Sequence, residues 1–193
     1  MNAWYKIARF LGKIILYLGP PVLVLGTLPE GPAILFCNHY SFLDPILLAI
    51  ILDRRLWFLA MPGVLKWKII GWVIRKCDWA FSISPKSQFS LRQAIKLLKQ
   101  GKTVVIFPEG TRSDSIQIQN FKPGLALLTR YAKAVPVAII GTFECLPRGR
   151  LFPRRHKIKI IIGQPIEFAA DQKNAEIVKV AKREISQLLG QTR

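Results

Sequence analysis

Hydrophobic residues along this chain alternate between short continuous runs and stretches with helical spacing. Apolar runs of strand length predict strands at residues 33–36, 56–59, 79–83, 103–107, 135–141 and 157–162. Helical spacing, with Pro or Gly near several ends, predicts helices at residues 44–52, 64–74, 90–100, 124–134 and 171–189. This alternation predicts an α/β fold: a single three-layer domain whose mixed, largely parallel sheet is flanked by helices.

The N-terminal residues carry an amphipathic pattern. Lys6, Arg9 and Lys13 fall on one helical face, and the first acidic residue is Glu30. The apolar residues on the opposite face are Trp4, Ile7, Ala8, Leu11, Ile14, Ile15 and Leu18. A basic amphipathic helix with aromatic residues near its start is typical of an interfacial membrane anchor. The alternative is a helix that packs on the domain's own core.

The membrane interpretation is favoured by the missing acidic residues and by the apolar run at residues 21–25. A full span is not expected. The most apolar run, residues 14–25, is about half the roughly 20 residues that cross a bilayer, and a Gly-Pro-Pro sequence interrupts it. We therefore expect an amphipathic membrane-association segment at residues 1–27, attached from one side, and one folded domain at residues 28–193.

Composition adds a strong positive charge to this pattern. The 193 residues include 29 Lys and Arg against 11 Asp and Glu, which gives a net charge of +18. Such a field attracts nucleic acid, anionic membranes or acidic and phosphorylated partners. Basic residues cluster between residues 53 and 102 and again at Arg148, Arg150, Arg154, Arg155, Lys157 and Lys159. Together with the N-terminal helix, these clusters favour an anionic membrane surface.

The cysteines indicate a reducing compartment. There are three, without paired or zinc-type spacing, so we expect neither a disulfide framework nor a metal site. The expected location is the cytoplasmic side of a membrane, with monotopic or peripheral attachment.

The segment after the first predicted strand holds the first candidate chemistry. It reads Asn38-His39-Tyr40-Ser41-Phe42-Leu43-Asp44. Histidine is suited to general base work near neutral pH, and a carboxylate on its other ring nitrogen fixes the tautomer. A strand-to-helix turn would bring Asp44 back toward His39. The alternative is structural: Asp44 followed by Pro45 is an ordinary start of a helix.

A second segment follows the predicted strand at residues 103–107. It reads Pro108-Glu109-Gly110-Thr111-Arg112-Ser113. Gly110 allows a sharp turn, and Arg112 between two hydroxyl residues is suited to gripping a phosphate. Taken alone, this segment is better interpreted as a turn with a solvated arginine.

Together, the two segments resemble the glycerolipid acyltransferases, which include the 1-acylglycerol-3-phosphate (lysophosphatidate) acyltransferases. They lie about seventy residues apart. Two further matches are Phe121-Lys122-Pro123-Gly124 and Ala134-Val135-Pro136-Val137. The resemblance covers roughly residues 28–142, and the pair of motifs is specific.

The resemblance implies a reaction and a site. His39 would take the proton of an acceptor hydroxyl, and Asp44 would orient His39. Glu109, Gly110, Thr111, Arg112 and Lys122 would form the acceptor site. An acyl group would pass from acyl-carrier protein or acyl-coenzyme A to lysophosphatidate, giving phosphatidate, with no metal or bound cofactor. The implied partners are anionic membrane lipids, a lysophospholipid acceptor and the acyl donor, with no nucleic acid.

One element departs from the family pattern. The family has a Phe-Ile-x-Arg sequence, and its Arg is taken to contact the acceptor's phosphate. Here Pro85 stands where the Arg is expected, and Lys86 is the nearest cation. Lysine offers a point charge without the guanidinium fork, so acceptor identity is left open. The alternatives are acylation of another lysolipid, a lipid-binding scaffold without catalysis, and a basic module that binds nucleic acid.

Overall fold

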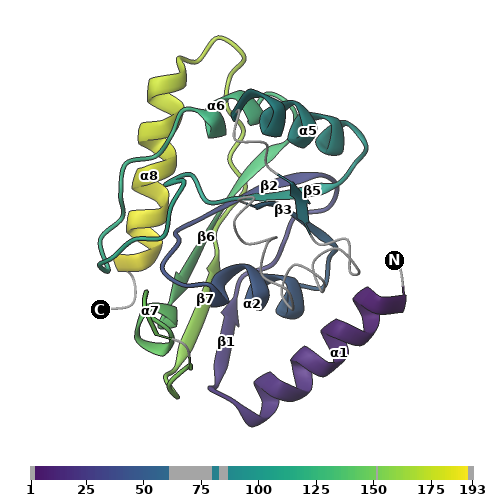
Figure 1. Ribbon diagram of the computed structural model, residues 1–193. Coiled ribbons are helices and arrows are strands. Elements are labelled where there is room, and N and C mark those ends of the chain that lie inside the picture. Colours follow the sequence, from purple (N-terminus) through teal and green to yellow (C-terminus); the bar gives the residue numbers. More distant parts are fainter. Residues whose placement is uncertain (1–2, 61–79, 83–86, 151, 191–193) are drawn as a thin grey trace.

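The computed structural model describes residues 3–60, 80–82, 87–150 and 152–190 (Figure 1). Within these residues, seven strands form one sheet in the order β1-β7-β6-β2-β5-β3-β4. Neighbouring strands are parallel except β6 and β7. The strands are β1 (Val22–Leu25), β2 (Ala33–Cys37), β3 (Leu56–Ala60), β4 (Ala80–Ser82), β5 (Thr103–Ile106), β6 (Lys133–Ile140) and β7 (Ile158–Ile162). The predicted single α/β domain with a mixed, largely parallel sheet is therefore confirmed.

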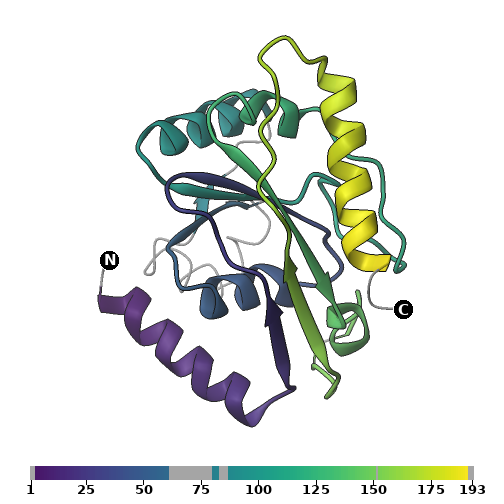
Figure 2. The same cartoon turned by 180° about the vertical axis from the view of Figure 1, so that it is seen from behind.

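Helices cover both faces of the sheet. The described helices are α1 (Ala3–Leu18), α2 (Leu43–Ile51), α5 (Ser87–Lys99), α6 (Gly124–Leu128), α7 (Thr142–Cys145) and α8 (Asn174–Gly190). One core cluster lies between the sheet and α2, with α1 outside it, and a second lies beneath α5, α6 and α8. Accordingly, α1 and α8 lie on opposite sides of the molecule in both views (Figure 1 and Figure 2).

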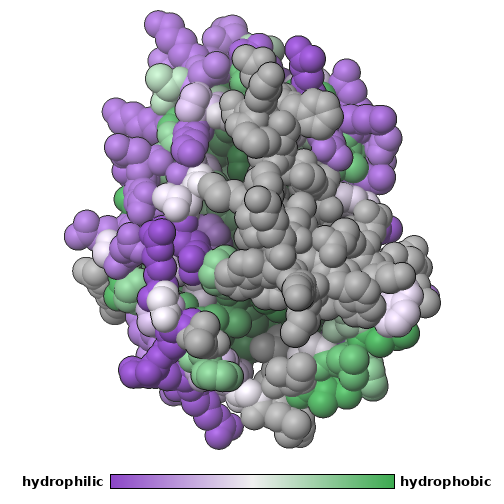
Figure 3. All heavy atoms as spheres, viewed as in Figure 1, coloured by the Kyte–Doolittle hydropathy of each residue, from purple (hydrophilic) through white to green (hydrophobic). Residues whose placement is uncertain are grey.

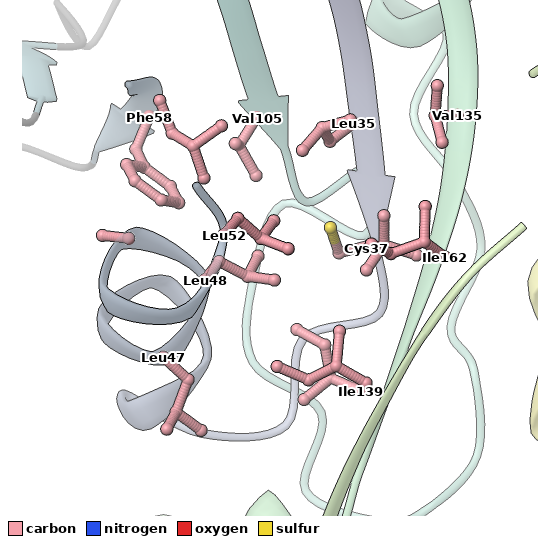
Figure 4. Packing of buried hydrophobic residues seen from close by; sticks show 14 of the residues in the cluster. Leu35, Cys37, Leu47, Leu48, Leu52, Phe58, Val105, Val135, Ile139 and Ile162 are labelled. Carbon is pink, nitrogen blue, oxygen red and sulfur yellow. The ribbon is translucent and has the colours of Figure 1, made fainter. Parts of the chain in front are cut away.

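The central strand β2 shows why its sequence is uniformly apolar. Ala33, Leu35 and Cys37 enter the α2-side core, while Ile34 and Phe36 enter the other. All five residues are fully buried, as expected for a strand of a parallel sheet with helices on both faces. In Figure 4, Leu35 and Cys37 lie above Leu48 of α2.

Strand β1 was not predicted from the sequence. We had placed residues 22–25 in the N-terminal segment 1–27, as part of an apolar run that favoured the membrane. They pair in parallel with β7 and complete one edge of the sheet. Four apolar residues between Pro21 and Gly26 are too few to distinguish a strand from other buried structure by periodicity.

Other boundaries also differ from the sequence pattern. The helix predicted to extend to residue 134 ends at Leu128, and β6 begins at Lys133, which pairs with Ala33. Lys133 is exposed and forms an ion pair with Glu167 at 2.9 Å. Because Lys133 is polar, the hydrophobic pattern does not mark it as part of a strand. Helix α5 begins at Ser87, three residues before the predicted start. The predicted helix at 64–74 lies outside the described residues.

Helix α1 packs on α2 through a narrow face of small residues and one arginine. Ala8 contacts the α2-side core, and a Cβ on Gly12 would lie 2.5 Å from Ile50 Cδ1. Arg9 is buried: its guanidinium donates to the Ile50 and Leu52 carbonyls at 3.3 and 3.0 Å. The placement of Arg9 on an outward basic face was therefore wrong. These carbonyls end α2, where a cation is favoured by the helix dipole.

The remaining apolar face of α1 is exposed. Its large side chains recur at helical spacing and are Trp4, Ile7, Phe10, Leu11 and Ile14. Figure 3 shows hydrophobic side chains gathered where α1 lies. Every described helix is too short or too polar to span a bilayer. The attachment of α1 to a membrane stays a prediction.

Replacing Arg9 with Ala should loosen α1 from α2. Hydrogen bonds that involve a charged group contribute roughly 1.5–3 kcal/mol each, so a loss of about 2 kcal/mol corresponds to exchange about 30-fold faster. Amide hydrogen exchange across α1 and the end of α2 measures it. Lys6→Ala and Lys13→Ala, at exposed positions, are the matched controls. Equal exchange in Arg9→Ala and both controls would show that Arg9 does not hold the helix.

Candidate active site

The two candidate segments meet at one edge of the sheet. Strands β2 and β5 are parallel neighbours, with Phe36 opposite Ile106. Their carboxyl ends therefore open side by side, and β6 ends at the same edge. We call this side of the sheet, where the carboxyl ends of β2, β5 and β6 lie, the catalytic edge. The turn at residues 38–44 follows β2, and the loop at residues 107–123 follows β5.

Asp44 holds His39 through a single carboxylate oxygen. Oδ2 of Asp44 lies 2.9 Å from Nδ1 of His39 and also accepts the backbone N–H groups of Tyr40 and Ser41, each at 2.8 Å. The Asp44 side chain has no exposed surface, while its Oδ1 is buried without a hydrogen-bond partner among the described residues. The predicted pairing of His39 with Asp44 is present in the structure.

Asp44 does not act as a helix cap. The residue before the first turn of α2 is Phe42, which makes no side-chain cap, and the backbone N–H of Leu43 donates to the Ser41 hydroxyl. The carboxylate instead bonds amides that precede the helix. The structural alternative considered for Asp44, a simple start of the helix, therefore does not describe its contacts.

Asp44 and Phe107 together fix the imidazole ring of His39. The Phe107 ring stacks on it, with centroids 4.1 Å apart and planes 21° apart. Because a carboxylate only accepts, Nδ1 of His39 carries the hydrogen of this pair, and in the neutral ring Nε2 keeps its lone pair. Among the described residues, Nε2 makes no hydrogen bond. The His39 side chain is 16% exposed, so it is partly accessible from outside the fold.

Glu109 joins the two segments. Its Oε1 accepts the backbone N–H of His39 at 2.9 Å, and its Oε2 accepts that of Gln119 at 3.0 Å. The backbone N–H of Ser113 donates to the His39 carbonyl at 2.8 Å. Burial raises the pKa of the Glu109 carboxyl, and these two amides partly oppose that rise. Glu109 therefore positions the backbone on which His39 sits.

Lys122 and Gly110 lie against each other. A Cβ on Gly110 would meet the flexible end of the Lys122 side chain, and the φ of +72° at Gly110 favours glycine there. The Lys122 amide also donates to the Pro108 carbonyl at 2.8 Å. The structure therefore brings together these two predicted acceptor-site residues, Gly110 and Lys122.

Arg112 lies over the ring of Phe42, with its guanidinium carbon 3.5 Å from the ring centroid. Burial, and then the nearby charge of Arg148, lower the pKa of this guanidinium. Thr111 is exposed in the same loop, and Lys86 lies outside the described residues.

Sequence reasoning did not assign roles to several residues of this turn. The Asn38 side chain exchanges two hydrogen bonds with the backbone of Ile139, at 2.7 and 2.8 Å, and so ties the end of β2 to β6. The Tyr40 hydroxyl donates to the Ile116 carbonyl at 2.8 Å. The signal available for Asn38 was its place directly after a buried strand, where an amide completes the backbone pairing.

The described part of the chain holds no group of three or more His, Cys, Asp or Glu side chains placed to bind a metal ion. The chemistry visible at the catalytic edge is that of a general base with an oriented imidazole.

Comparison with known protein families identifies the origin of this arrangement. A family model described as Acyltransferase matches residues 22–140, more than half of the chain. The chain belongs to the acyltransferase family.

Relatives of this family member carry related names. A 1-acyl-sn-glycerol-3-phosphate acyltransferase of Bacillus subtilis is 32% identical over 174 residues, covering 86% of this chain and 83% of that protein. The chloroplastic enzyme of the same name from Arabidopsis thaliana is 34% identical over 144 residues, covering 71% of this chain and 40% of that protein. A lyso-ornithine lipid O-acyltransferase of Rhizobium meliloti is 30% identical over 148 residues, covering 75% of this chain and 47% of that protein.

The fold also has a solved counterpart. The crystal structure of the 1-acyl-sn-glycerophosphate acyltransferase of Thermotoga maritima matches with a TM-score of 0.81 and 24% identity, covering 98% of this chain and 80% of that one. That likeness concerns the fold. The chain spans less than half the length of its Arabidopsis, Brassica and Chlamydomonas relatives.

Changing Glu109 to Gln should destabilise the protein in a pH-dependent way. Gln has one acceptor oxygen for two amides, and an unpaired buried donor costs roughly 1–3 kcal/mol. Because burial raises the folded-state pKa of Glu109, ionising it disfavours folding. The stability advantage of wild type over Glu109→Gln should therefore shrink as pH rises above about 4.5. Urea unfolding across that range measures the advantage.

Glu167→Gln is the control for this titration. Glu167 is exposed, and its hydrogen bond with Lys133 lowers the pKa of its carboxyl. Any stability advantage of wild type over Glu167→Gln should therefore be present at pH values above the ordinary carboxyl pKa and be lost as pH falls. It should be small, because water screens the ion pair. A Glu109 advantage that grew with rising pH would contradict the assigned cause.

Proposed function

We propose that this protein is a 1-acylglycerol-3-phosphate O-acyltransferase. It moves a fatty acyl group from acyl-carrier protein or acyl-coenzyme A to the free hydroxyl of lysophosphatidate, giving phosphatidate. The observation that carries the proposal is the imidazole of His39, which is bound to Asp44 at Nδ1 and belongs to a partly exposed side chain whose Nε2 makes no hydrogen bond among the described residues. The names of the Bacillus and Arabidopsis relatives support the choice of acceptor.

In the proposed reaction, Nε2 of His39 takes the proton of the acceptor hydroxyl as the oxygen attacks the thioester carbonyl. The carbonyl π pair moves onto its oxygen, giving a tetrahedral intermediate. When this intermediate collapses, the carbon–sulfur bond breaks and the imidazolium returns its proton to the leaving sulfur. Asp44 stabilises the imidazolium between these steps. The proposed steps require no metal or bound cofactor.

Arg112 and Lys122 are proposed to hold the acceptor's phosphate. Both belong to the loop that Glu109 ties to His39. A phosphate on Arg112 would meet a guanidinium already fixed by Phe42, which lowers the side-chain entropy lost on binding. Lys86 remains a further candidate cation for this site.

A lysolipid without a phosphate monoester is the second candidate acceptor. It is favoured by the similarity to the lyso-ornithine lipid O-acyltransferase and by Pro85 at the position of the family arginine. Transfer to either acceptor would use His39 as the base. The two acceptors differ in the group that anchors them in the site.

The protein is also proposed to bind anionic membranes from the cytoplasmic side, through α1, and not to bind nucleic acid. The exposed side chains Trp4, Ile7, Phe10, Leu11 and Ile14 support this attachment. A lipid acceptor would reach the catalytic edge from the membrane surface.

Removing the base should abolish most of the transfer. General acid–base catalysis contributes about 100- to 10,000-fold, so His39→Ala should lower kcat/KM by that range while the thermal unfolding midpoint changes little. Asp44→Asn keeps one oxygen for the three hydrogen bonds, places an NH2 group at the buried Oδ1 position and removes the charge, so it should lower kcat about 100-fold or more. The exposed Asp171→Asn is the control.

The measurement is acyl transfer in membranes supplied with a labelled thioester and either lysophosphatidate or lyso-ornithine lipid. The proposal requires that lysophosphatidate be the better acceptor. Near-normal turnover in His39→Ala would remove His39 as the base, whereas a faster wild-type reaction with lyso-ornithine lipid would favour the second candidate.

Replacing Arg112 with Ala should weaken use of lysophosphatidate specifically. Losing charge-assisted hydrogen bonds worth roughly 1.5–3 kcal/mol should raise the acceptor KM about tenfold or more, with the donor KM unchanged. Arg130→Ala is the control, because Arg130 is exposed before β6, at the opposite edge of the sheet. A rise confined to the donor KM would assign Arg112 to the donor instead.

A further inference from the structure

The loop between α7 and β7, described at residues 146–150 and 152–157, lies at the catalytic edge. Strand β6 ends there, and the antiparallel β7 begins there at Ile158. The Leu146 carbonyl accepts a hydrogen bond from the Ser41 hydroxyl at 2.8 Å. The loop therefore borders the turn that carries His39.

This loop combines exposed cations with an exposed aromatic ring. Phe152 is 79% exposed, the largest exposed fraction among the large hydrophobic side chains of the described residues. The chain has no acidic residue from 145 to 166. Arg148 pairs with Asp114, whereas Arg150, Arg154 and Arg155 are exposed and have no ion-pair partner among the described residues. An open hollow of about 630 Å³ is lined by Arg148, Gly149, Arg150, Phe152, Pro153 and Arg154.

The loop is also adjacent to the carboxyl end of α1. Ile158 pairs with Val22, and its backbone N–H donates to the Pro21 carbonyl at 3.0 Å. Because α1 leads into β1 through residues 19–21, helix and loop meet at the catalytic edge, and both lie toward the lower end of Figure 1.

We propose that the loop between α7 and β7 forms a second membrane contact, separate from α1. The ring of Phe152 enters the interface of an anionic bilayer, and Arg150, Arg154 and Arg155 bind headgroup phosphates. The bilayer is then held by α1 and by this loop, beside the turn that carries His39. The inference rests on the proposed function only in taking the acceptor from a membrane.

A bilayer fits this loop better than an acidic protein does. An anionic membrane presents phosphates above an apolar layer, so it offers a partner both to guanidinium groups and to an unburied ring among them. An acidic donor protein would pair with the cations and leave Phe152 without an apolar environment. The exposed apolar face of α1, whose carboxyl end lies near this loop, favours the same occupant.

The experiment is co-sedimentation of the full-length protein with vesicles of phosphatidylcholine alone or mixed with phosphatidylglycerol. Each of Arg150→Ala, Arg154→Ala and Arg155→Ala should weaken binding to anionic vesicles about fivefold, which corresponds to about 1 kcal/mol per basic residue. These losses should vanish in high salt. Phe152→Ala should weaken binding to both vesicle types, and this loss should persist in high salt.

Leu127→Ala and Arg130→Ala are the matched controls, because both side chains are exposed around α6, away from the loop. Vesicle binding of the loop variants equal to that of these controls would overturn the inference. So would unchanged vesicle binding with a raised KM for acyl-carrier protein, which would assign the loop to an acidic donor. Loop-dependent binding by a protein that does not acylate lysophosphatidate would refute the proposed function and leave the membrane contact standing.

Discussion

The catalytic edge depends on one buried carboxylate. The Asp44 side chain is inaccessible to water, and a buried charge is costly unless hydrogen bonds satisfy it. One of its oxygens receives the ring N–H of His39 and the amides of Tyr40 and Ser41, and this requires residues 38–44 to fold into a tight turn. The position of the base and the path of the chain into α2 are therefore set by the same interaction. Because α2 supplies Leu47 and Leu48 to the core beneath the sheet (Figure 4), the turn that positions His39 and the hydrophobic core both depend on α2.

The sequence predicted the part of the site that lies within one short segment of the chain. His39 and Asp44 lie in one short turn, so the spacing alone brings them within reach. Glu109 was placed at the site by resemblance, but its two backbone bonds depend on β2 and β5 being neighbours. Nothing in a seventy-residue separation gives that adjacency. Phe107 was assigned only to a strand end for the same reason, and its contact with His39 became visible once both strand ends were placed.

The fold shows a similar division. Runs buried on both faces, such as β2, were predictable because no position is polar. Strand β1 was missed at an edge, where Leu23 and Leu25 are exposed and the four residues carry little pattern. Hydropathy also predicted α1 as a helix but misjudged Arg9, because a cation can be buried where carbonyl groups end another helix. The small residues Ala8 and Gly12 form the packing face, which an amphipathic pattern does not distinguish from the apolar face.

The fixed imidazole of His39 has a consequence for regiochemistry. Asp44 holds one edge of the ring and Phe107 covers one face, so the lone pair of Nε2 points along a single line in the ring plane. A base held in this way can accept a proton only from a hydroxyl group that lies on this line. The hydroxyl that reacts is the one brought onto that line when the rest of the acceptor is anchored. Under the proposed function, the distance from the anchoring group to the ring, rather than any property of the base, would decide which position of the lipid is acylated, and a change of anchor alone would redirect the same chemistry to a different lipid.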